Sequence, residues 1–517
     1  GRIRALKDKN NNTINFNYTE GKVVSLSHPN GRTITLTYNG AGKITRADGP
    51  AGRAVTYSYD ENSNLAQAND IALRPENYTY NIDHQVATIT DKKANPVYSN
   101  TYDIYNRAAE KTINGDAAFS SDFSLQERKT ITTGPEGIQT MDKFDSQFRP
   151  VESQDALKNL TQIEYDGDYG PKAIKDGRGL VTQYKHDIHG NVTEVMNDNG
   201  EALKLYYDYK DQLIARTDPN SYSQVYLYDD RGNMVTVYNY AILYFDDQGN
   251  LTNYGYDPDD VLTINYDASG SPMSIVDANK NTSNMSYDSN GMVTGIEKAS
   301  GLAITQVHDS QSRLTEIRDG AGHNATFGYD NANNLSSVTT SAGSVNYEYD
   351  ANDNLTKITD AKTRPTQFGY DSKNNLTSVI DSKDETTSYT YNVFNNLTAA
   401  NLPNGTSLRY MYDENNRKIA MITGYSDTPL VPEIATLPQS AIDFARVDLG
   451  QSLTRTLKIY NIGLGDLVIS DIASSNNAYT TNFTSAITVP GGDIAQIPVT
   501  FTPVGEGPAN GTLTITN

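Results

Sequence analysis

The chain has 517 residues, of which 37% are apolar, and its formal net charge at pH 7 is −21. An acidic surface of this kind repels nucleic acid, anionic lipid and anionic polysaccharide, so no nucleic-acid partner is expected. The chain has no cysteine, which excludes disulfides and thiolate metal sites, and it has no apolar run of the roughly 18 residues that a membrane span needs.

An aromatic side chain recurs from residue 18 to residue 412 at a nearly constant interval. Its positions, which we call slots, are Tyr18, Tyr38, Tyr59, Tyr80, Tyr102, Phe123, Phe144, Tyr165, His186, Tyr207, Tyr228, Phe245, Tyr266, Tyr287, His308, Tyr329, Tyr349, Tyr370, Tyr391 and Tyr412. The steps are 20 to 22 residues, except for 17 between Tyr228 and Phe245. Self-similarity at a fixed period predicts a repeat architecture.

Each repeat reads as a β-hairpin. A second large apolar residue often stands two before the slot, and residues two apart share one face of a strand. Asp usually follows the slot and begins a turn, and Gly or Asn then supplies the positive φ, as in the stretch DDRGNM at 229–234. An aliphatic residue six after the slot begins the returning strand, and a second Asp eleven after it marks a turn at the opposite end. We call these two turns the slot turn and the return turn.

Some repeats follow this pattern more closely than others, and their slot, turn and return residues are the predicted structural residues of the array. They are Tyr228, Asp229, Gly232, Asn233, Tyr329, Asp330, Leu335, Tyr349, Asp350, Leu355, Tyr370, Asp371, Leu376, Tyr391, Leu397, Tyr412 and Asp413.

Twenty hairpins give on the order of 40 strands, a ribbon roughly 190 Å wide if it were flat. Sheets of that width twist and coil. Since one face carries the rings and aliphatics, we expect the ribbon to wind with that face inward, as a tube, spiral or shell. The least regular parts are Asn100 to Pro150 and the short step before Phe245. There the sheet is expected to bend or a loop to project, and loop-borne function would be sought there first.

The motif Tyr-Asp-x-x-Gly-Asn-Leu followed by Asp-x-x-Gly and Tyr-x-Tyr-Asp resembles the YD repeat of Rhs-type proteins, the insecticidal toxin-complex shell and the teneurins. The resemblance covers residues 1–423 and implies a β-sheet that spirals into a shell, often around a toxin segment. The Asp-Pro-x-Gly-rich end of the Rhs core has no counterpart here, because YDPDDV at 256–261 shares only Tyr-Asp-Pro and lies in mid-array. No cleavage site is therefore carried over.

The repeat register ends near residue 423. A proline-rich linker is predicted at 424–437, with Pro429 and Pro432, and Pro438 follows it. Residues 438–517 contain about seven short predicted strands, which favour a β-sandwich. They resemble the immunoglobulin-like domain related to ASPM, SPD-2 and Hydin. Because Gly1 opens within a repeat and the chain stops on an expected strand, we expect a processed or excised piece of a longer protein.

Candidate metal sites are few. Acidic turns at Asp166 to Gly170, Asn197 to Gly200 and Asp257 to Asp260 are rich in oxygen, which leaves calcium open as a cofactor, but none matches a 12-residue calcium loop. Solvated turns are the preferred interpretation. His186 and His308 fill aromatic slots and are interpreted as packing substitutes for Tyr, and His186 with His189 lacks a nearby third ligand. No metal or other cofactor is assigned.

No catalytic motif is present, so no enzyme is predicted. The sequons at Asn250, Asn354, Asn375 and Asn396 arise from the turn itself and are weak evidence for glycosylation. The leading hypothesis is a non-catalytic scaffold outside a bacterial cell or on its surface, whose copies assemble end to end into a fibre through unpaired strand edges. The alternatives are an Rhs-type cocoon that encloses a polypeptide and an adhesin that binds surface glycans or cells.

Overall fold

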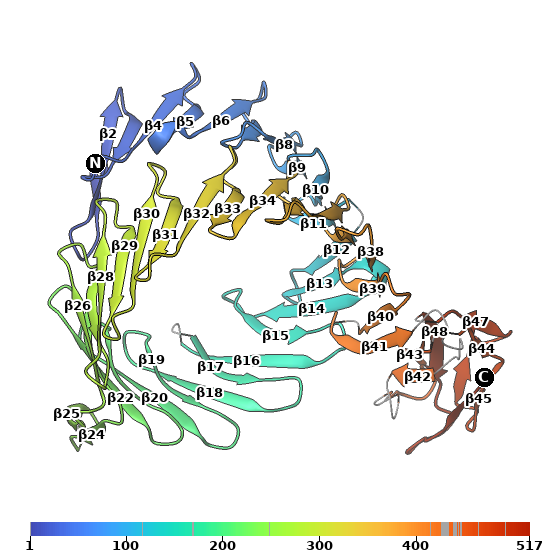
Figure 1. Ribbon diagram of the computed structural model, residues 1–517. Helices are drawn as coiled ribbons and strands as arrows, with labels where there is room; N and C mark the ends of the chain where they lie inside the picture. The colour runs from blue at the N-terminus through green and yellow to red at the C-terminus, as the bar shows by residue number, and fades with distance from the viewer. Residues whose placement is uncertain are drawn as a thin grey trace. The chain divides into compact units, whose positions relative to one another are not determined.

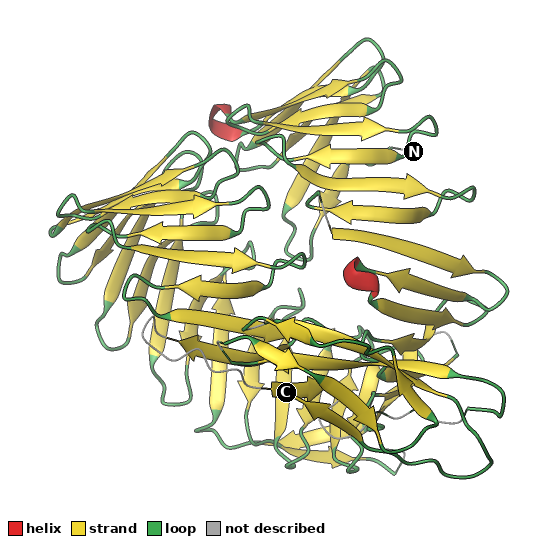
Figure 2. Cartoon of the chain, turned by 90° about the vertical axis from the view of Figure 1, so that its right-hand side faces the viewer, coloured by secondary structure: helices red, strands yellow, loops and turns green. Residues whose placement is uncertain are grey.

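Strands and short turns make up almost all of the protein (Figure 2). A computed structural model describes residues 2–115, 117–167, 170–247, 249–413, 415–424, 434–437, 442, 444, 447–463, 465–491 and 493–517. Within these ranges the helical elements are the single-turn 3₁₀ helices η1 (Pro50–Gly52) and η2 (Pro135–Gly137), and none is long and apolar enough to cross a membrane. The predicted all-β class is confirmed.

One antiparallel sheet of 39 strands contains β1–β23 and β26–β41, and successive strands pair along the chain (Figure 1). Its first strands are β1 Ala5–Lys7, β2 Thr13–Thr19, β3 Lys22–Ser27, β4 Thr33–Tyr38, β5 Ile44–Asp48, β6 Ala54–Tyr59, β7 Leu65–Asn69, β8 Pro75–Tyr80, β9 Val86–Thr90, β10 Pro96–Tyr102, β11 Ala108–Ile113, β12 Ala117–Ser124, β13 Lys129–Thr133, β14 Gln139–Phe144, β15 Pro150–Gln154, β16 Leu160–Asp166, β17 Gly170–Lys175, β18 Val181–His186, β19 Val192–Met196, β20 Ala202–Tyr207, β21 Leu213–Thr217, β22 Ser223–Tyr228 and β23 Met234–Tyr238.

The sheet continues with β26 Val261–Tyr266, β27 Pro272–Val276, β28 Thr282–Tyr287, β29 Val293–Lys298, β30 Ala303–His308, β31 Leu314–Asp319, β32 Asn324–Tyr329, β33 Leu335–Thr340, β34 Gly343–Tyr349, β35 Leu355–Thr359, β36 Pro365–Tyr370, β37 Leu376–Ile380, β38 Thr386–Tyr391, β39 Leu397–Asn401, β40 Ser407–Tyr412 and β41 Lys418–Gly424. The chain divides into two compact units, one of residues 1–366 with 372–374 and one of 367–371 with 375–517.

A β-bulge recurs in the repeat. The register shifts immediately before nineteen of the twenty slots, for example between Ser286 and Tyr287, whereas Phe123 pairs with Thr130 in continuous register. A bulge bends its strand and increases the local twist. Because the bulge returns at the same place in each hairpin, its bends add up, which accounts for a sheet that coils.

The slot tyrosines link each repeat to the one before it. At least twelve donate a hydrogen bond from the phenol to a backbone carbonyl upstream, usually that of the residue six after the previous slot, as Tyr59 does to Ile44 at 2.7 Å. The ring covers apolar neighbours while its hydroxyl bonds the backbone. This dual role explains why the slot holds Tyr far more often than Phe.

Removing one of these hydroxyls is expected to loosen one repeat. Tyr287→Phe deletes the 2.8 Å hydrogen bond to the Pro272 carbonyl and keeps the ring. One net hydrogen bond contributes about 1 kcal/mol, so the free energy of local opening of β27 and β28 should fall by about that amount. Hydrogen exchange of these strands measures it. Tyr209→Phe is the control, since Tyr209 lies exposed on a turn, and equal loss of protection in both variants would contradict the assignment.

The short step before Phe245 forms a hairpin outside the main sheet. Strands β24 (Ile242–Phe245) and β25 (Leu251–Gly255) pair only with each other, and β23 pairs directly with β26. Tyr266 accordingly donates its hydrogen bond to Met234, 32 residues upstream, across the excluded hairpin. The expectation of a projecting element is met here, but Phe245 is not a slot of the main sheet. The step of 17 residues is too short for this hairpin to continue the regular repeat within the main sheet.

The hairpin also shows which face of the sheet is convex. Its residues Ala241, Leu243 and Leu251 pack on β20–β23, where the outward positions just before the slots are Tyr206 and Leu227. In most other repeats this position is polar, and it is exposed at Ser58, Thr79, Ser286 and Glu348. In Figure 1, β24 and β25 lie at the outer margin of the curved sheet. The Tyr-x-Tyr rings of the first unit, on the other face, therefore face inward, as predicted.

The other irregular part, Asn100 to Pro150, stays within the sheet as β10–β15. It has lost the second ring before each slot and the bulge at Phe123, but not its strand pairing. The backbone hydrogen bonds between these strands therefore form without the second aromatic ring of each repeat.

The C-terminal strands form small sheets around a separate core. They are β42 Ile434–Leu437, β43 Leu453–Asn461, β44 Leu467–Ile469, β45 Asp471–Ser474, β46 Tyr479–Thr481, β47 Ile487–Val489, β48 Ile494–Phe501 and β49 Leu513–Thr516. The order β42-β43-β48-β46 makes one sheet, and β44–β47 and β45–β49 make two pairs. Ile459, Ile469 and Val499 are fully buried in one cluster, which gives the predicted sandwich a continuous apolar core.

The first strand of this domain lies inside the stretch predicted as linker. Strand β42 covers Ile434–Leu437 and pairs with β43, whereas the linker was placed at 424–437. A strand can follow shortly after prolines. The proline density of this stretch pointed to a linker, so the strand was not predicted. Pro429, Pro432 and Pro438 lie outside the described residues, so the domain limits 1–423 and 438–517 stay predictions.

Candidate functional site

The sheet of the first unit curves until distant repeats lie side by side, with β29–β34 next to β2–β8 (Figure 1). Residues 223 to 279 positions apart then touch through their turns. Return turns of the first winding meet slot turns of the second winding. We call this line of contacts the seam.

Polar contacts repeat along the seam. Lys9 Nζ donates to the Gly232 carbonyl at 2.7 Å, Asn12 to the Ser269 carbonyl at 2.9 Å, Asn30 to the Ser289 carbonyl at 3.4 Å and Arg53 to the Gln311 carbonyl at 3.5 Å. Cations and amides of return turns therefore donate to backbone oxygens of slot turns. All slot turns lie at one end of the strands, and all return turns lie at the other end. The seam therefore joins the return-turn edge of the first winding to the slot-turn edge of the second.

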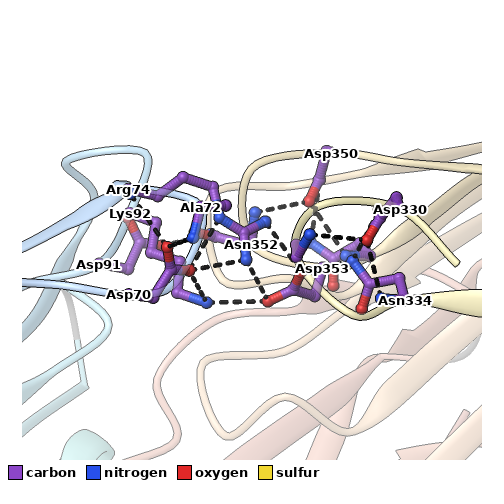
Figure 3. A network of polar contacts seen from close by, with 12 residues as sticks. Asp70, Ala72, Arg74, Asp91, Lys92, Asp330, Asn334, Asp350, Asn352 and Asp353 are labelled. Carbon is purple, nitrogen blue, oxygen red and sulfur yellow. Dashed lines mark hydrogen bonds and ion pairs between the residues drawn. The ribbon is translucent and has the colours of Figure 1, made fainter. Parts of the chain in front are cut away.

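The densest part of the seam is a group of side chains from the return turns β7–β8 and β9–β10 and the slot turns β32–β33 and β34–β35 (Figure 3). We call it the seam cluster: Asp70, Arg74, Asp91, Lys92, Lys93, Asn334, Asp350, Asn352 and Asp353. Arg74 donates from both terminal nitrogens to Asp353, at 2.8 and 3.1 Å, and from Nε to Asp70 at 2.9 Å. Bidentate arginine–carboxylate pairs are the strongest kind of ion pair.

Lysines and an amide complete the seam cluster. Lys92 Nζ lies 2.8 Å from Asp353 and 3.0 Å from Asp70, and Lys93 Nζ lies 2.8 Å from Asp350. In the opposite direction, Asn352 donates to Asp91 at 2.5 Å. Three cations of the first winding are thus matched to two carboxylates of the second, with the Arg74 side chain only 19% exposed.

These contacts change the acidity of the cluster. Partial burial alone would raise the pKa of Asp353, but hydrogen bonds from Arg74, Asn334 and Lys92 lower it to about 2. The pKa of Asp70 is lowered further below its usual range, because hydrogen bonds from Arg74 and Lys92 outweigh its burial. Both carboxylates remain charged, and the ion pairs stay intact, at any pH near neutrality.

Acid is expected to weaken the seam in a defined window. The pKa of Asp353 is lower in the folded protein than the ordinary 3.8, so its stabilisation is complete above pH 4 and is lost as the pH falls towards 2. The loss is about 2 kcal/mol at most, from 1.36 kcal/mol per pKa unit. Urea unfolding followed by circular dichroism at pH 7, 5, 3 and 2 measures it. An Asp353→Asn variant with the same pH profile would contradict this assignment.

Two family models match parts of this chain. Residues 255–389 match the family model described as Teneurin YD-shell, and residues 432–517 match that of the ASPM-SPD-2-Hydin domain. The chain carries a YD-shell segment followed by an ASPM-SPD-2-Hydin domain. Both resemblances suspected from the sequence are confirmed.

Solved structures similar to this YD-repeat chain include two toxin-complex assemblies. One is a mutant Tc holotoxin pore of Photorhabdus luminescens, at 12% identity and a TM-score of 0.48, covering 98% of this chain and 28% of that one. The other is the TcdB2–TccC3–Cdc42 complex, at 12% identity and a TM-score of 0.43, covering 88% and 28%. The chain thus spans less than a third of their length. A comparison with curated protein sequences gave no match.

The slot turns of the YD repeats share one hydrogen-bonding pattern. In the turn 229–233, Asp229 Oδ1 accepts hydrogen bonds from the backbone of Arg231 and Asn233, and Gly232 has φ 82°. Asn233 also donates across the seam to Asn10 at 3.0 Å. Asp330 and Asp350 cap the corresponding turns by the same two backbone bonds, and Asp413 bonds Asn415 and Arg417.

The remaining predicted structural residues lie in strands or at turn starts. Tyr228, Tyr329, Tyr349, Tyr391 and Tyr412 bond upstream carbonyls, and the carbonyls of Leu335, Leu376 and Leu397 are among the acceptors. Tyr370 pairs with Leu376 at a bulge, Leu355 pairs with Tyr349, and Asp371 accepts from Asn375. Only some of these turns lie on the seam, which brings Gly232, Asn233 and Asp350 to the first winding.

The candidate metal ligands are engaged in hydrogen bonds, several of them within their own turns. Asn197 accepts from the backbone of Asn199 and Glu201, and Asp257 accepts from Asp259. In the turn 166–170, residues 168 and 169 lie outside the described part. His189 contacts Asp211 at 2.6 Å, and His308 Nδ1 is buried without a hydrogen-bond partner. Among the described residues, no three potential ligands gather around one point.

The sequon amides are also occupied by the turns. Asn250, Asn354 and Asn375 donate to the aspartate four residues earlier, and Asn396 donates to Asn416 in the next repeat. A glycan on any of these nitrogens would leave the amide one N–H fewer for these hydrogen bonds.

Sequence reasoning missed the seam cluster. Arg74, Lys92 and Lys93 stand in return turns, and nothing in their local sequence names a partner some 260 residues away. The available signal was a concentration of cations in the return turns of residues 53–93 in an otherwise acidic chain.

Proposed function

We propose that this YD-repeat protein is a non-catalytic structural scaffold that works outside the cell or on its surface. The observation that carries the proposal is the seam. A long single-layered sheet has few buried contacts of its own, but here each winding is fastened to the next by turn-to-turn hydrogen bonds and by the seam cluster. Such a wall resists unwinding without a second layer to cover it.

The composition of the wall suits exposure to water on both sides. Large apolar side chains that are fully buried are few in the described array and are concentrated in the C-terminal domain. Tyrosine supplies contact area while its hydroxyl stays hydrogen bonded. The absence of cysteine leaves no thiol for an oxidising environment to modify.

Three uses of the scaffold stay open as predictions: end-to-end assembly into a fibre, enclosure of a polypeptide, and adhesion to glycans or cells. Electron microscopy of purified protein separates them, since a fibre gives filaments, and a cocoon gives discrete particles whose contents co-purify. A glycan array tests adhesion.

Antibody labelling of intact cells tests the proposed function. The protein should be labelled without lysis, and its array should resist external protease, because the seam holds the turns in place. The Arg74→Glu variant should be labelled equally but cut faster at the return turns. Labelling that requires lysis, or an array that is cut at once in the native protein, would contradict the proposal.

A further inference from the structure

A row of exposed apolar side chains follows one edge of the first winding. Its members, which we call the apolar rim, are Ile82, Ile104, Tyr105, Leu125, Phe148, Ile188 and Tyr209, and their exposed fractions run from 62% for Leu125 to 94% for Ile82. They stand in the slot turns β8–β9, β10–β11, β12–β13, β14–β15, β18–β19 and β20–β21. In an antiparallel meander these turns lie at the same edge, and neighbouring ones are about 10 Å apart.

The slot turns that are already covered have a different composition. In the turns that contact the first winding, the residue two after the slot is Asp230, Ala268, Ser289, Ser310 or Ala351. In the rim the same position holds Ile82, Ile104, Leu125, Ile188 or Tyr209, except in the turn β14–β15, where Ser146 stands there and Phe148 is the apolar residue. The slot turns at the start of the first winding are exposed too but hold Glu20, Gly40 and Glu61. The apolar residues are therefore confined to the turns from β8–β9 to β20–β21. The turn fold itself does not require apolar residues there.

Phe148 gives a second sign that these side chains are needed. It occupies the left-handed position of its turn, with φ 60°, where Gly190 and Gly232 stand in other slot turns. A bulky residue in that region is disfavoured. The sequence thus keeps an exposed aromatic ring at a position where glycine would adopt the positive φ without strain.

Part of the charge on the rim turns is compensated. Asp103 pairs with Arg107 at 2.6 Å, and Asp145 pairs with Arg149 at 2.8 Å, both within their turns. These ion pairs reduce the repulsion between two rims, although the same turns also hold Asp83, Asp187 and Asp208.

The area is sufficient for a stable contact between two copies. Seven side chains that each bury roughly 150 Å² would cover about 1,000 Å², and a specific interface needs roughly 800 Å² from each partner. Isolated exposed apolar residues need no explanation, but a row of this size marks an interaction site. The turn β16–β17 stands within the row and contributes none of its members, and residues 168 and 169 of that turn lie outside the described part. The rim also runs directly into the seam edge at β22–β23, where the same kind of turn is already an interface.

We propose that the apolar rim is a self-association surface on which a second copy of this chain docks, rim against rim, about a twofold axis. An apolar row fits an identical apolar row, whereas the free return turns of the second winding, such as 277–281 and 360–364, are polar. A twofold axis makes the two rims antiparallel. Phe148 then meets its own copy near the axis, and Ile104 meets Ile188 of the other copy.

Sedimentation of the full chain tests whether the rim makes a dimer. The native protein should change from monomer to dimer between about 1 and 100 µM, and Ile104→Asp and Phe148→Asp should each weaken the dimer at least about tenfold. Val504→Asp is the matched control, since Val504 is 86% exposed in the C-terminal domain. Unchanged circular dichroism shows that the variants fold. A monomer at every concentration, or a dimer that the rim variants leave intact, would overturn the proposal.

Cysteine cross-linking tests the geometry, because the native chain has no thiol. Phe148→Cys should form a disulfide-linked dimer on oxidation, and a mixture of Ile104→Cys and Ile188→Cys proteins should link to each other more than either links to itself. A Val504→Cys protein should remain monomeric. Cross-links at Val504 equal to those at Phe148 would show random contact.

Lipid is the competing occupant of an exposed apolar edge. Flotation with neutral phosphatidylcholine vesicles should leave the native protein in the unbound fraction. Binding that Phe148→Asp abolishes, in a protein that sediments as a monomer, would overturn the proposal in favour of a membrane surface. These measurements use purified protein, so their failure is distinguishable from failure of the proposed scaffold role, which is tested on cells.

Discussion

Arg74→Glu is expected to open the seam and to lower its stability by about 2 kcal/mol. The pair with Asp353 is partly buried, so its loss should cost more than the about 0–1 kcal/mol of an exposed pair and less than the about 3–5 kcal/mol of a buried one. The substitution removes the bidentate bonds to Asp353 and places a third carboxylate next to Asp70 and Asp353. Hydrogen exchange in the turns 70–74 and 350–354, together with the urea midpoint, measures the effect. Lys92 contacts both aspartates, so part of the attraction remains.

Arg364→Glu is the matched control. Arg364 occupies the same turn position and pairs with Asp360, four residues earlier, as Arg74 pairs with Asp70. Its side chain is 60% exposed, and exposed pairs contribute about 0–1 kcal/mol. Adding Asp353→Arg to Arg74→Glu should restore part of the loss, because the charges are then exchanged. Equal effects of Arg74→Glu and Arg364→Glu would show that the seam cluster does not hold the windings.

Asn461→Ala is expected to destabilise the C-terminal domain by about 3 kcal/mol. Asn461 is fully buried, donates to the carbonyls of Gly465 at 2.6 Å and Val489 at 2.8 Å, and accepts from the Gly463 backbone at 3.0 Å. Alanine leaves these groups buried without that partner, and each unsatisfied group costs about 1–3 kcal/mol. Thermal unfolding of the full chain by calorimetry, in which the domain transition shifts downward, measures the loss.

Asn476→Ala provides the comparison within the same domain. Asn476 makes similar bonds, to the Asn510 carbonyl at 2.9 Å and from the Ala478 backbone at 3.0 Å, but the Asn510 contact is exposed. Water replaces such bonds, so the loss should be about 1 kcal/mol or less. An effect as large as that of Asn461→Ala would mean that burial does not set the cost.

Local sequence was sufficient for much of the array. The slot spacing predicts the hairpins, and Asp after the slot predicts turns such as 229–233, since both depend on interactions within a few residues. The excluded hairpin β24–β25 was visible only as a short step. Its packing was also signalled by Tyr206 and Leu227, which stand at positions that are polar in most other repeats. That signal can be used only once the faces of the sheet are known.

The seam could not be derived in this way. Whether Arg74 meets Asp353 depends on the total curvature of some two dozen strands, and a small change of twist per strand would shift the contact to another repeat. The same holds for the apolar rim. Ile82 or Ile188 alone is an ordinary exposed residue, and the row emerges only when the turns are aligned at one edge.

The sequence by itself determined the repeat, the hairpins and the all-β class, because a periodic pattern of rings and turn residues acts through contacts close along the chain. The tertiary structure decided which winding touches which, where the charged seam cluster forms and which edge remains apolar and free. Those outcomes depend on the total twist of the sheet, which accumulates over many repeats. Each residue contributes only a small part of that twist, so the total cannot be derived from single residues.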